Sequence, residues 1–495
     1  MPSKELNKIA LNPHRVRKVA IIGGGASGAI ALDSLIKENT FQKIVLFERR
    51  DRFGGIWCLD ENVEQQQVVP GSTSDIADPQ LKNPFKEKEN AGKRYINTEQ
   101  PSQNRFIETP SYSNMKTNII EKLMTYSDDN AWPVDGDRNT IDTTYVDRSI
   151  VEKYILKYIS RNAFQENVDI LTNTSVEDIE RVFKSDLDRK SSSYLFKLTI
   201  RTTQEDLVDT WRQDVFDAIV VATGHYHVPY VPCVPGLGSI IEKFPSKVHH
   251  AKYFRNTDVY KDKTILIIGS RASGADLSKL IADKAYKVFQ SIRSIENTKV
   301  ISKKANVYQK PLINKFEVTS DDTIKVFFDD DSLLLNPDFI IYCTGYQFSF
   351  PFLNNLKGNG KVTKDGQIIP DLYQHTILID EPLITFIGIP IDAVSFRVFE
   401  YQAILISRYL AGRIELPDVK EQRNWAEDRM QKKGATRAYH TIGAIEALEY
   451  INTLTRLGHL KESTIVGRKF PVLTLDDLTR YKAASELLRE NWDSR

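Results

Sequence analysis

Residues 21–29 read Ile-Ile-Gly-Gly-Gly-Ala-Ser-Gly-Ala, and a near copy, Ile-Ile-Gly-Ser-Arg-Ala-Ser-Gly-Ala, follows at residues 267–275. Each copy ends a short apolar run and opens an amphipathic one, which is the pattern of a strand that turns into a helix. We expect strands at 18–22 and 44–48 around a helix at 26–37, then strands at 264–268 and 287–292 around a helix at 272–284. This alternation predicts an α/β fold with two Rossmann-like domains, each built on a parallel, doubly wound sheet.

The first loop has the spacing of a pyrophosphate cradle, Gly23-x-Gly25-x-x-Gly28. The first glycine makes the turn, the second admits the phosphates, and the third lets helix and strand pack closely. Glu48 ends the next predicted strand, where a carboxylate can accept both hydroxyls of a ribose. Because the whole unit is present, we interpret it as a dinucleotide site and not as an ordinary glycine turn. Its candidate residues are Gly23, Gly25, Ala26, Ser27, Gly28 and Glu48.

The second loop has Arg271 in place of the middle glycine, so a pyrophosphate approaches it less easily but meets a cation. A dinucleotide with a 2'-phosphate needs positive charge near its adenosine ribose, and Arg271 and Arg293 are placed to supply it. The sequence therefore predicts NADPH over NADH. Arg293 is equally well explained as a solvated residue at a strand end. The candidate residues are Gly269, Ser270, Arg271, Ser273, Gly274, Asp276 and Arg293.

Composition excludes several other classes of protein. The 495 residues carry 67 Lys and Arg against 66 Asp and Glu, and this net charge of +1 gives no reason to expect nucleic acid or an anionic membrane. We find neither a signal peptide nor an apolar run of the roughly 18 residues that a spanning helix needs. The three cysteines show no metal or disulfide spacing, which favours a reducing compartment and a cytoplasmic location. We expect no metal site, because the acidic run 329–331 is typical of a turn.

Two dinucleotide folds in one chain suggest a flavin and a nicotinamide placed face to face for hydride transfer. Disulfide reductases of this architecture carry a redox-active cysteine pair, which this chain lacks. The predicted electron acceptor is therefore oxygen, a quinone or an artificial acceptor.

Further motifs resemble those of flavin-containing monooxygenases, in the same order along the chain. They comprise Gly54-Gly55-Ile56-Trp57, the Thr117-Asn118 segment, the Ala222-Thr223-Gly224 and Cys343-Thr344-Gly345 links, the signature from Phe244 to Phe254, and Glu400-Tyr401-Gln402-Ala403. Ser246 and Arg271 replace glycines of the family pattern. The resemblance covers residues 19–412, and the polar segment 61–110 reads as an insertion in loop conformation. Baeyer–Villiger monooxygenases end the signature with tryptophan, where this chain has Phe254, so oxidation of a heteroatom is favoured over that alternative.

The resemblance implies an FAD-binding domain at 1–225 plus 336–495 and an inserted NADPH-binding domain at 226–335. It adds Gly55, Ile56, Trp57, Thr117, Asn118 and Gln402 to the FAD site. In this family NADPH reduces FAD, and oxygen then forms a C4a-hydroperoxide that oxidises a soft nucleophile. Asn118 is our catalytic candidate, since a neutral amide can hydrogen-bond the peroxide without supplying a proton. The alternative role of Asn118 is a cap for a helix at 119–124.

The resemblance to soluble fungal members predicts a small thiol, thioether or amine as the substrate. An NADPH oxidase or quinone reductase on the same fold, and a nucleotide sensor without turnover, remain alternatives. The sequence leaves open the oligomeric state and an association with the surface of the endoplasmic reticulum.

Overall fold

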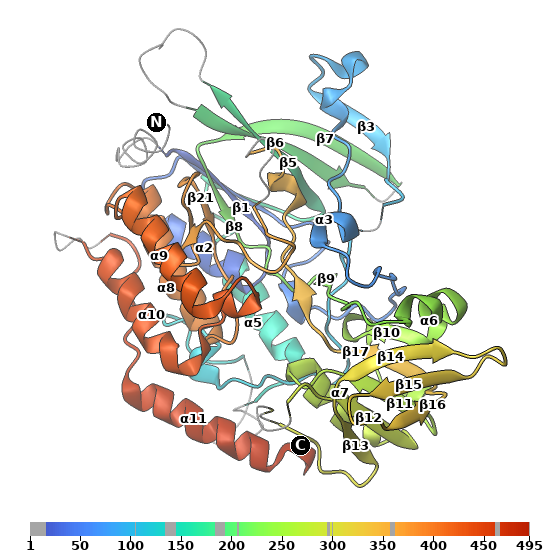
Figure 1. Cartoon of the computed structure of the whole chain (residues 1–495). Helices are drawn as coiled ribbons and strands as arrows, with labels where there is room; N and C mark the ends of the chain where they lie inside the picture. The colour runs from blue at the N-terminus through green and yellow to red at the C-terminus, as the bar shows by residue number, and fades with distance from the viewer. Residues whose placement is uncertain are drawn as a thin grey trace.

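The two glycine loops each follow a central strand of a separate parallel sheet. The computed structural model describes residues 16–103, 105–133, 145–183, 194–204, 207–294, 298, 300–356, 362–460 and 466–494. Figure 1 shows the two sheets in separate parts of the molecule, with the helices of the C-terminal third along one side and the bottom. The predicted α/β class with two Rossmann-like domains is confirmed.

The first domain is built on a seven-stranded sheet. Its order is β19 (Leu372–Tyr373), β20 (Ile377–Leu378), β21 (Ile384–Phe386), β8 (Ala218–Val221), β1 (Lys18–Ile22), β2 (Lys43–Phe47) and β4 (Val168–Leu171). The five strands from β21 to β4 are parallel, whereas β20 is antiparallel to its neighbours. The predictions for β1 and for helix α2 (Ala26–Lys37) are confirmed, and β2 lies one residue earlier than expected.

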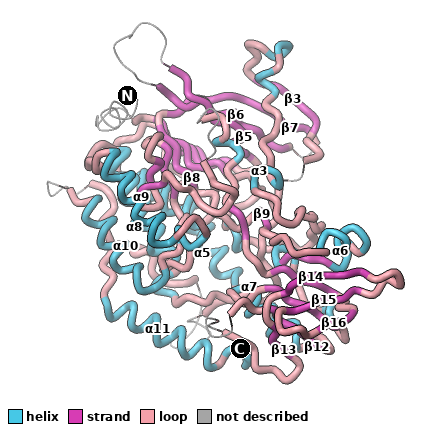
Figure 2. The backbone as a smooth tube through the Cα atoms, viewed as in Figure 1, coloured by secondary structure: helices cyan, strands magenta, loops and turns pink. Residues whose placement is uncertain are grey.

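Helices pack around α2 to close the core of this domain. Helix α8 (Ser395–Leu410) packs against α2 and against α10 (Gly443–Leu457), and α5 (Arg148–Ser160) packs against α2. Helix α9 (Val419–Lys433) lies beside them, and Figure 2 shows α8 to α11 together on one side of the molecule. Helix α2 is buried without a gap from Ala26 to Leu35, because its small residues let α8 and β1 approach closely.

The second domain is built on a five-stranded parallel sheet. Its order is β10 (Val248–His250), β17 (Phe339–Tyr342), β11 (Thr264–Ile268), β12 (Lys287–Ser291) and β13 (Val307–Lys310). Helix α7 (Ala272–Ala282) follows the second glycine loop and ends two residues before the predicted end, and α6 (Leu237–Lys243) precedes β10. A hairpin of β15 (Ile324–Phe328) and β16 (Leu333–Leu335) turns at the acidic run 329–331, and β14 (Ile313–Val318) is its third strand.

Two short strands join the domains. The chain leaves the first sheet after β8 and returns after β17, and the two links pair as β9 (Val228–Pro229) and β18 (Tyr346–Gln347). The domain boundaries remain a prediction, with one addition from the sheet order. Strand β17 lies beyond the predicted boundary at 335/336 yet belongs to the second sheet.

The polar segment 61–110 has more regular structure than the predicted loop. It contains α3 (Ser74–Ala77) and β3 (Tyr95–Glu99), and β3 pairs with β7 (Val208–Phe216) at the edge of a sheet completed by β6 (Tyr194–Thr203) and β5 (Thr174–Phe183). Sequence periodicity missed β3 because this edge strand buries only Ile96 fully. Asp217 separates β7 from β8 and accepts hydrogen bonds from the amides of Arg17 and Lys18.

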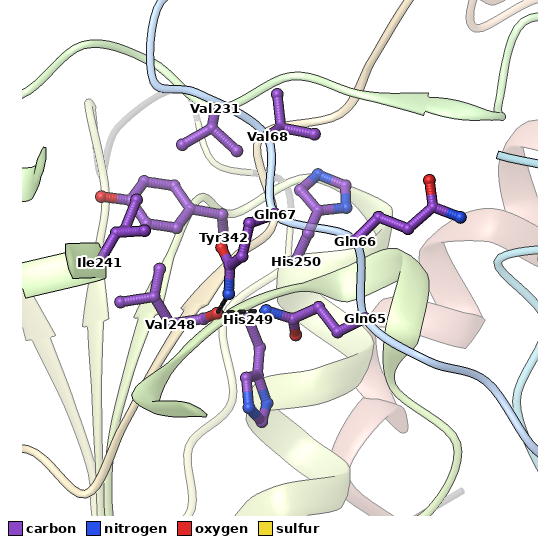
Figure 3. A pocket seen from close by; sticks show the side chains of 10 residues that line it. All are labelled: Gln65, Gln66, Gln67, Val68, Val231, Ile241, Val248, His249, His250 and Tyr342. Atoms are coloured by element: carbon purple, nitrogen blue, oxygen red, sulfur yellow. Dashed lines mark hydrogen bonds between the residues drawn. The ribbon is translucent and has the colours of Figure 1, made fainter. Parts of the chain in front are cut away.

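The same segment also contacts the second domain. Figure 3 shows the amides of Gln65 and Gln67 both reaching the carbonyl of Val248 on β10. They border a small pocket between the segment and this domain, lined by Gln65, Gln66, Gln67, Val68, Val231, Ile241, Val248, His249, His250 and Tyr342. The segment is therefore attached to both domains.

The C-terminal helix α11 (Leu475–Glu490) also spans both domains. It begins after a capping box formed by Thr474 and Asp477. Lys122 of the first domain donates to Asp477 at one end, and Trp492 packs against Lys279 of α7 at the other, with the ammonium 4.6 Å from the ring centroid.

Candidate functional site

The first glycine loop is shaped by close backbone contacts. Gly23 has φ +112°, and a Cβ there would lie 2.5 Å from the carbonyl oxygen of Ala222. A Cβ on Gly28 would lie 1.9 Å from the carbonyl oxygen of Gly23. Helix α2 begins directly after Gly25, so its free amide groups face the loop. The loop therefore fits the pyrophosphate of a dinucleotide.

Residues 54–57 lie against this loop. The amide of Gly54 donates to the carbonyl of Gly24 at 3.1 Å, and a Cβ on Gly25 would lie 3.4 Å from Cα of Gly55. The turn Gly55–Trp57 is held from outside, where Arg148 donates to the carbonyl of Trp57 at 3.0 Å and Ser111 donates to that of Ile56. The structure thus brings together two motifs that are 30 residues apart in sequence.

Glu48 directly follows β2, and its side chain points back to the loop. It is 5% exposed, and its two oxygens accept the amides of Gly24 at 2.7 Å and Arg50 at 2.9 Å. Burial raises the pKa of Glu48, and these two hydrogen bonds oppose the shift. A carboxylate has about four acceptor positions, so two remain for the hydroxyls of a ribose.

Thr117 and Asn118 lie in a segment tied to the start of α5. Thr117 is buried and exchanges hydrogen bonds with Val146, backbone to backbone at 2.9 Å and through its hydroxyl at 3.1 Å. Asn118 is exposed. The alternative role of Asn118 as a helix cap is wrong, because only a short 3-10 turn, η4 (Glu121–Leu123), follows, and Ile120 occupies its N-cap position.

Gln402 has a buried side chain whose amide oxygen and nitrogen each form a hydrogen bond within the protein. Its oxygen accepts the amide of Gly388 at 3.0 Å, and its nitrogen donates to the hydroxyl of Tyr450 at 2.9 Å. A Cβ on Gly388 would lie 2.4 Å from Oγ of Ser27. Gln402 therefore fixes the Gly388 loop beside the first glycine loop. Sequence reasoning missed Gly388, although its position two residues after β21, at the carboxyl edge of the sheet, is a recognisable signal.

The second glycine loop repeats the geometry of the first. Gly269 has φ +114°, and a Cβ there would lie 2.5 Å from the carbonyl oxygen of Cys343; a Cβ on Gly274 would lie 2.2 Å from that of Gly269. Arg271 occupies the N-cap of α7 with a side chain that is 75% exposed, and its guanidinium lies 3.5 Å from Asp392 of the first domain. This loop also fits a pyrophosphate, with a cation at its rim.

The other predicted residues of this site lie in the second glycine loop, in α7 and just after β12. Ile292 follows β12 where Glu48 follows β2, since the amides of Gly269 and Gly23 bond to the preceding residues in the same way. Arg293 next to it is exposed. Ser270 lies 3.1 Å from Thr298 through their hydroxyls, Ser273 is half-buried, and Asp276 accepts from the hydroxyl of Tyr112.

Buried polar groups hold the link between the domains. His250 bonds the carbonyl of Gly345 at 3.0 Å, and burial lowers its pKa to about 3. Lys252 is fully buried and donates to the carbonyls of Phe106, Glu108 and His227. Lys252 thus ties the 61–110 segment to the link, a contact that no sequence motif indicated.

Two absences hold for the part of the chain that the structure describes. It contains no group of three or more His, Cys, Asp or Glu side chains that could hold a metal ion. Nor does any helix within the described residues have the length and apolarity needed to cross a membrane.

The chain belongs to the flavin-binding monooxygenase-like family, whose model matches residues 85–310 and 304–480. The resemblance predicted from the ordered motifs is therefore confirmed, and the protein is a flavoprotein monooxygenase. FAD and NADPH, with oxygen as co-substrate, are the cofactors of this family.

Relatives of fungal and plant origin match most of the chain. The flavin-containing monooxygenase ustF2 of Aspergillus flavus is 26% identical over 90% of this chain and 92% of its own length. The flavin-containing monooxygenase iboF of Amanita muscaria is 27% identical over 86% and 85%. Among solved structures, S-allyl-L-cysteine S-oxygenase from Allium sativum is 26% identical over 97% of this chain and 94% of its own, with a TM-score of 0.71. Cyclohexanone monooxygenase shares the fold at a TM-score of 0.53 and 13% identity, covering 89% of this chain and 97% of its own.

Proposed function

We propose that this protein is an NADPH-dependent monooxygenase that oxygenates a soft sulfur or nitrogen nucleophile, such as a thiol, a thioether or an amine, through a flavin C4a-hydroperoxide. The observation that carries the proposal is the pair of glycine loops at the carboxyl edges of two parallel sheets, joined through the β9–β18 link. Flavin supplies the oxygen chemistry when bound, and the protein binds, orients and shields the reacting groups.

The two loops would divide the cofactors between them. The first loop, Glu48 and residues 54–57 would hold FAD, because Glu48 directs a carboxylate to the ribose position. The second loop would hold NADPH, because its equivalent position is the apolar Ile292 and arginines lie at 271 and 293. A carboxylate at Ile292 would repel a 2'-phosphate, so its absence supports NADPH over NADH.

Side chains that do not readily donate a proton at pH 7 support oxygenation over the release of hydrogen peroxide. Asn118 offers a neutral amide, and burial keeps both His225 and His250 neutral at pH 7, since it lowers the pKa of each to about 3. Arg437 further lowers the pKa of His225. We propose Asn118 as the catalytic residue that hydrogen-bonds the reactive oxygen without giving it a proton.

The substrate class rests on one relative and one motif. The Allium sativum relative is an S-oxygenase of S-allyl-L-cysteine, which supports sulfur as the oxidised atom. Phe254, at the position where Baeyer–Villiger enzymes have tryptophan, is buried against Tyr112 at 5.2 Å and Tyr260 at 6.0 Å between ring centroids. A cytoplasmic location belongs to the same proposal, supported by the free cysteines Cys58, Cys233 and Cys343.

Rapid mixing tests the proposal directly. The purified holoprotein is reduced anaerobically with NADPH and mixed with oxygen, and its absorbance spectrum is followed without substrate. We expect a long-lived hydroperoxide band that a thiol or amine discharges. Direct return to oxidised flavin with stoichiometric hydrogen peroxide would contradict the proposal and favour an NADPH oxidase.

The variant Asn118→Ala tests the role of the amide in the same assay. We expect it to retain FAD and consume NADPH, while the product formed per NADPH falls and hydrogen peroxide rises. Undiminished coupling would remove Asn118 from the mechanism.

A further inference from the structure

Arg437 has a guanidinium with no acceptor among the described residues. It lies in the 3-10 turn η10 (Arg437–His440) of the first domain, and its Nη1 atom is buried without a hydrogen-bond partner. Its one ring contact is the face of Phe348, 5.7 Å from the ring centroid. A buried donor without a partner is costly, and a charged one more so, which points to a ligand that supplies the missing acceptor.

The surrounding hydrogen bonds fix the turn that carries Arg437. Arg429 of α9 donates to the carbonyls of Tyr439 at 2.6 Å and Thr441 at 3.0 Å. The carbonyl of His440 accepts the amide of Ile391 at 2.9 Å, which attaches the turn to the loop after β21. The backbone of this turn is therefore fixed before any ligand arrives.

The electrostatic neighbours of Arg437 come from both domains. Burial lowers the pKa of its guanidinium and Arg271 of the second glycine loop lowers it further, while Tyr226 and Asp392 oppose them. Asp392 is half exposed and lies 3.5 Å from Arg271, and the same carboxylate raises the pKa of Arg437. Burial keeps His225 and His440 neutral by lowering their pKa values, so neither adds charge of either sign at pH 7.

We propose that Arg437 and Arg271 together bind an oxyanion between the two domains. This inference rests on the proposed function, which supplies two sources of one chemistry: a phosphate group of the nicotinamide dinucleotide, or a carboxylate on the substrate. Arg271 lies at the rim of the dinucleotide loop and 3.5 Å from Asp392, and the turn that carries Arg437 is hydrogen-bonded to Ile391, the residue before Asp392. A guanidinium binds either oxyanion with two parallel hydrogen bonds.

The first arm measures the dinucleotide source. NADP⁺ is titrated into oxidised holoprotein, and binding is followed by the change in flavin absorbance. If a phosphate group occupies the site, Arg437→Met raises the Kd at least about tenfold, as loss of a charge-assisted hydrogen bond does. Arg437→Lys, which keeps the charge but not the fork, gives a smaller rise.

The second arm measures the substrate source with two thiols that differ by one carboxylate. If the substrate supplies the oxyanion, Arg437→Met lowers the ratio of kcat/KM for cysteine over cysteamine at least about tenfold, while the Kd of NADP⁺ stays unchanged. Either result supports the site and identifies its occupant.

Two further variants separate the site from general damage. Arg423, whose guanidinium pairs with Asp380 at 2.5 Å, provides the matched control: Arg423→Met leaves both readouts unchanged. Asp392→Asn removes the carboxylate that competes with the oxyanion for the two arginines. We therefore expect this variant to lower the Kd of the oxyanion. Asn also tolerates the left-handed backbone of Asp392, whose φ is 55°.

The inference is overturned if Arg437→Met retains FAD and changes neither readout by more than about twofold, well below a tenfold loss. Inorganic pyrophosphate provides a readout without turnover, since it should raise the unfolding temperature of the wild type more than that of Arg437→Met. A wild type that binds pyrophosphate through Arg437 but neither binds NADP⁺ nor oxidises thiols would contradict the proposed function and leave the oxyanion site intact.

Discussion

The chain contains the same strand–loop–helix unit twice, with nearly identical backbones in different surroundings. Gly25 and Arg271 cap their helices with φ of −89° and −78° and ψ of −164° and −167°. Neither conformation requires glycine. Gly25 is restricted by a neighbour, since Gly55 packs against it, whereas the side chain of Arg271 is 75% exposed.

This difference separates a closed site from an open one. The first loop is covered by residues 54–57 and braced by α8, and its helix is buried for most of its length. The second loop is open at its rim and meets the other domain through the exposed pair of Arg271 and Asp392. A covered loop suits a cofactor that stays bound, and an open loop suits one that is exchanged at each turnover.

The largest expected effect comes from adding one methyl group to either loop. The Cβ of Gly28→Ala would lie 1.9 Å from the carbonyl oxygen of Gly23, so helix and loop must separate. We expect this variant to lose FAD, with the absorbance ratio of flavin to protein at least about tenfold below that of the wild type.

Gly274→Ala provides the matched test in the second loop, where the Cβ would lie 2.2 Å from the carbonyl oxygen of Gly269. It should retain FAD and lose affinity for NADP⁺. Loss of FAD from both variants would show that the two loops do not hold separate cofactors.

Arg468 holds helix α2 of the first unit against helix α8 through buried ion pairs. Its side chain is 4% exposed and pairs with Asp33 of α2 at 2.5 Å, with Asp128 at 2.6 Å and with Glu400 of α8. Arg468→Met leaves these carboxylates without their buried partner, so we expect a loss of about 3–5 kcal/mol in the free energy of unfolding by urea.

Arg161 pairs with the same Asp33 and Asp128 but is 33% exposed. Arg161→Met should therefore cost less than about 1 kcal/mol. Equal losses in the two variants would mean that the burial of Arg468 adds nothing to the stabilisation from its ion pairs.

A smaller effect is expected for the cation of the second loop. Arg271→Ala removes a positive charge near the phosphates, so the ratio of kcat/KM for NADPH over NADH should fall about five- to tenfold, or roughly 1–1.4 kcal/mol. Arg293→Ala tests the second predicted cation in the same way. An unchanged ratio in both variants would contradict the prediction of NADPH specificity.

The smallest effect is a pH dependence of the stability that the ion pairs of Arg468 provide. Burial raises the pKa of Asp128, but Arg468 and Lys37 outweigh burial and hold the pKa below its ordinary value of 3.8. The stabilisation is therefore complete above pH 3.8 and is lost as the pH falls through the lowered pKa. Acid unfolding followed by flavin fluorescence should show a shallower dependence in Arg468→Met, and parallel curves would count against this role.

Sequence periodicity predicted the parts of the fold whose signal is local. The glycine loops, α2, β1 and β11 have their expected bounds, because the glycines and the apolar runs beside them mark strand ends and helix starts. The capping box of Thr474 and Asp477 at the start of α11 is a local signal of the same kind.

Parts of the site depend on contacts that no local pattern encodes. Gly388 lies beside Ser27 only because β21 pairs with β8, and the turn that carries Arg437 reaches the loop of Asp392 only through the hydrogen bond between Ile391 and His440. Lys252 is a surface residue by type, yet three carbonyls from distant segments surround its ammonium. Long-range pairing sets these positions.

The paired links β9 and β18 join an inserted domain to a divided one, which bears on the order in which the two domains fold during synthesis. Strand β8 of the first sheet must wait for β21, which pairs Ile219 with Ile384, whereas the second sheet is complete once β17 has emerged at residue 342. We therefore expect the inserted domain to fold on the ribosome first, while the amino-terminal half of the flavin domain still lacks its remaining strands. Nascent chains arrested between these two points should already bind NADP⁺ and not yet bind FAD.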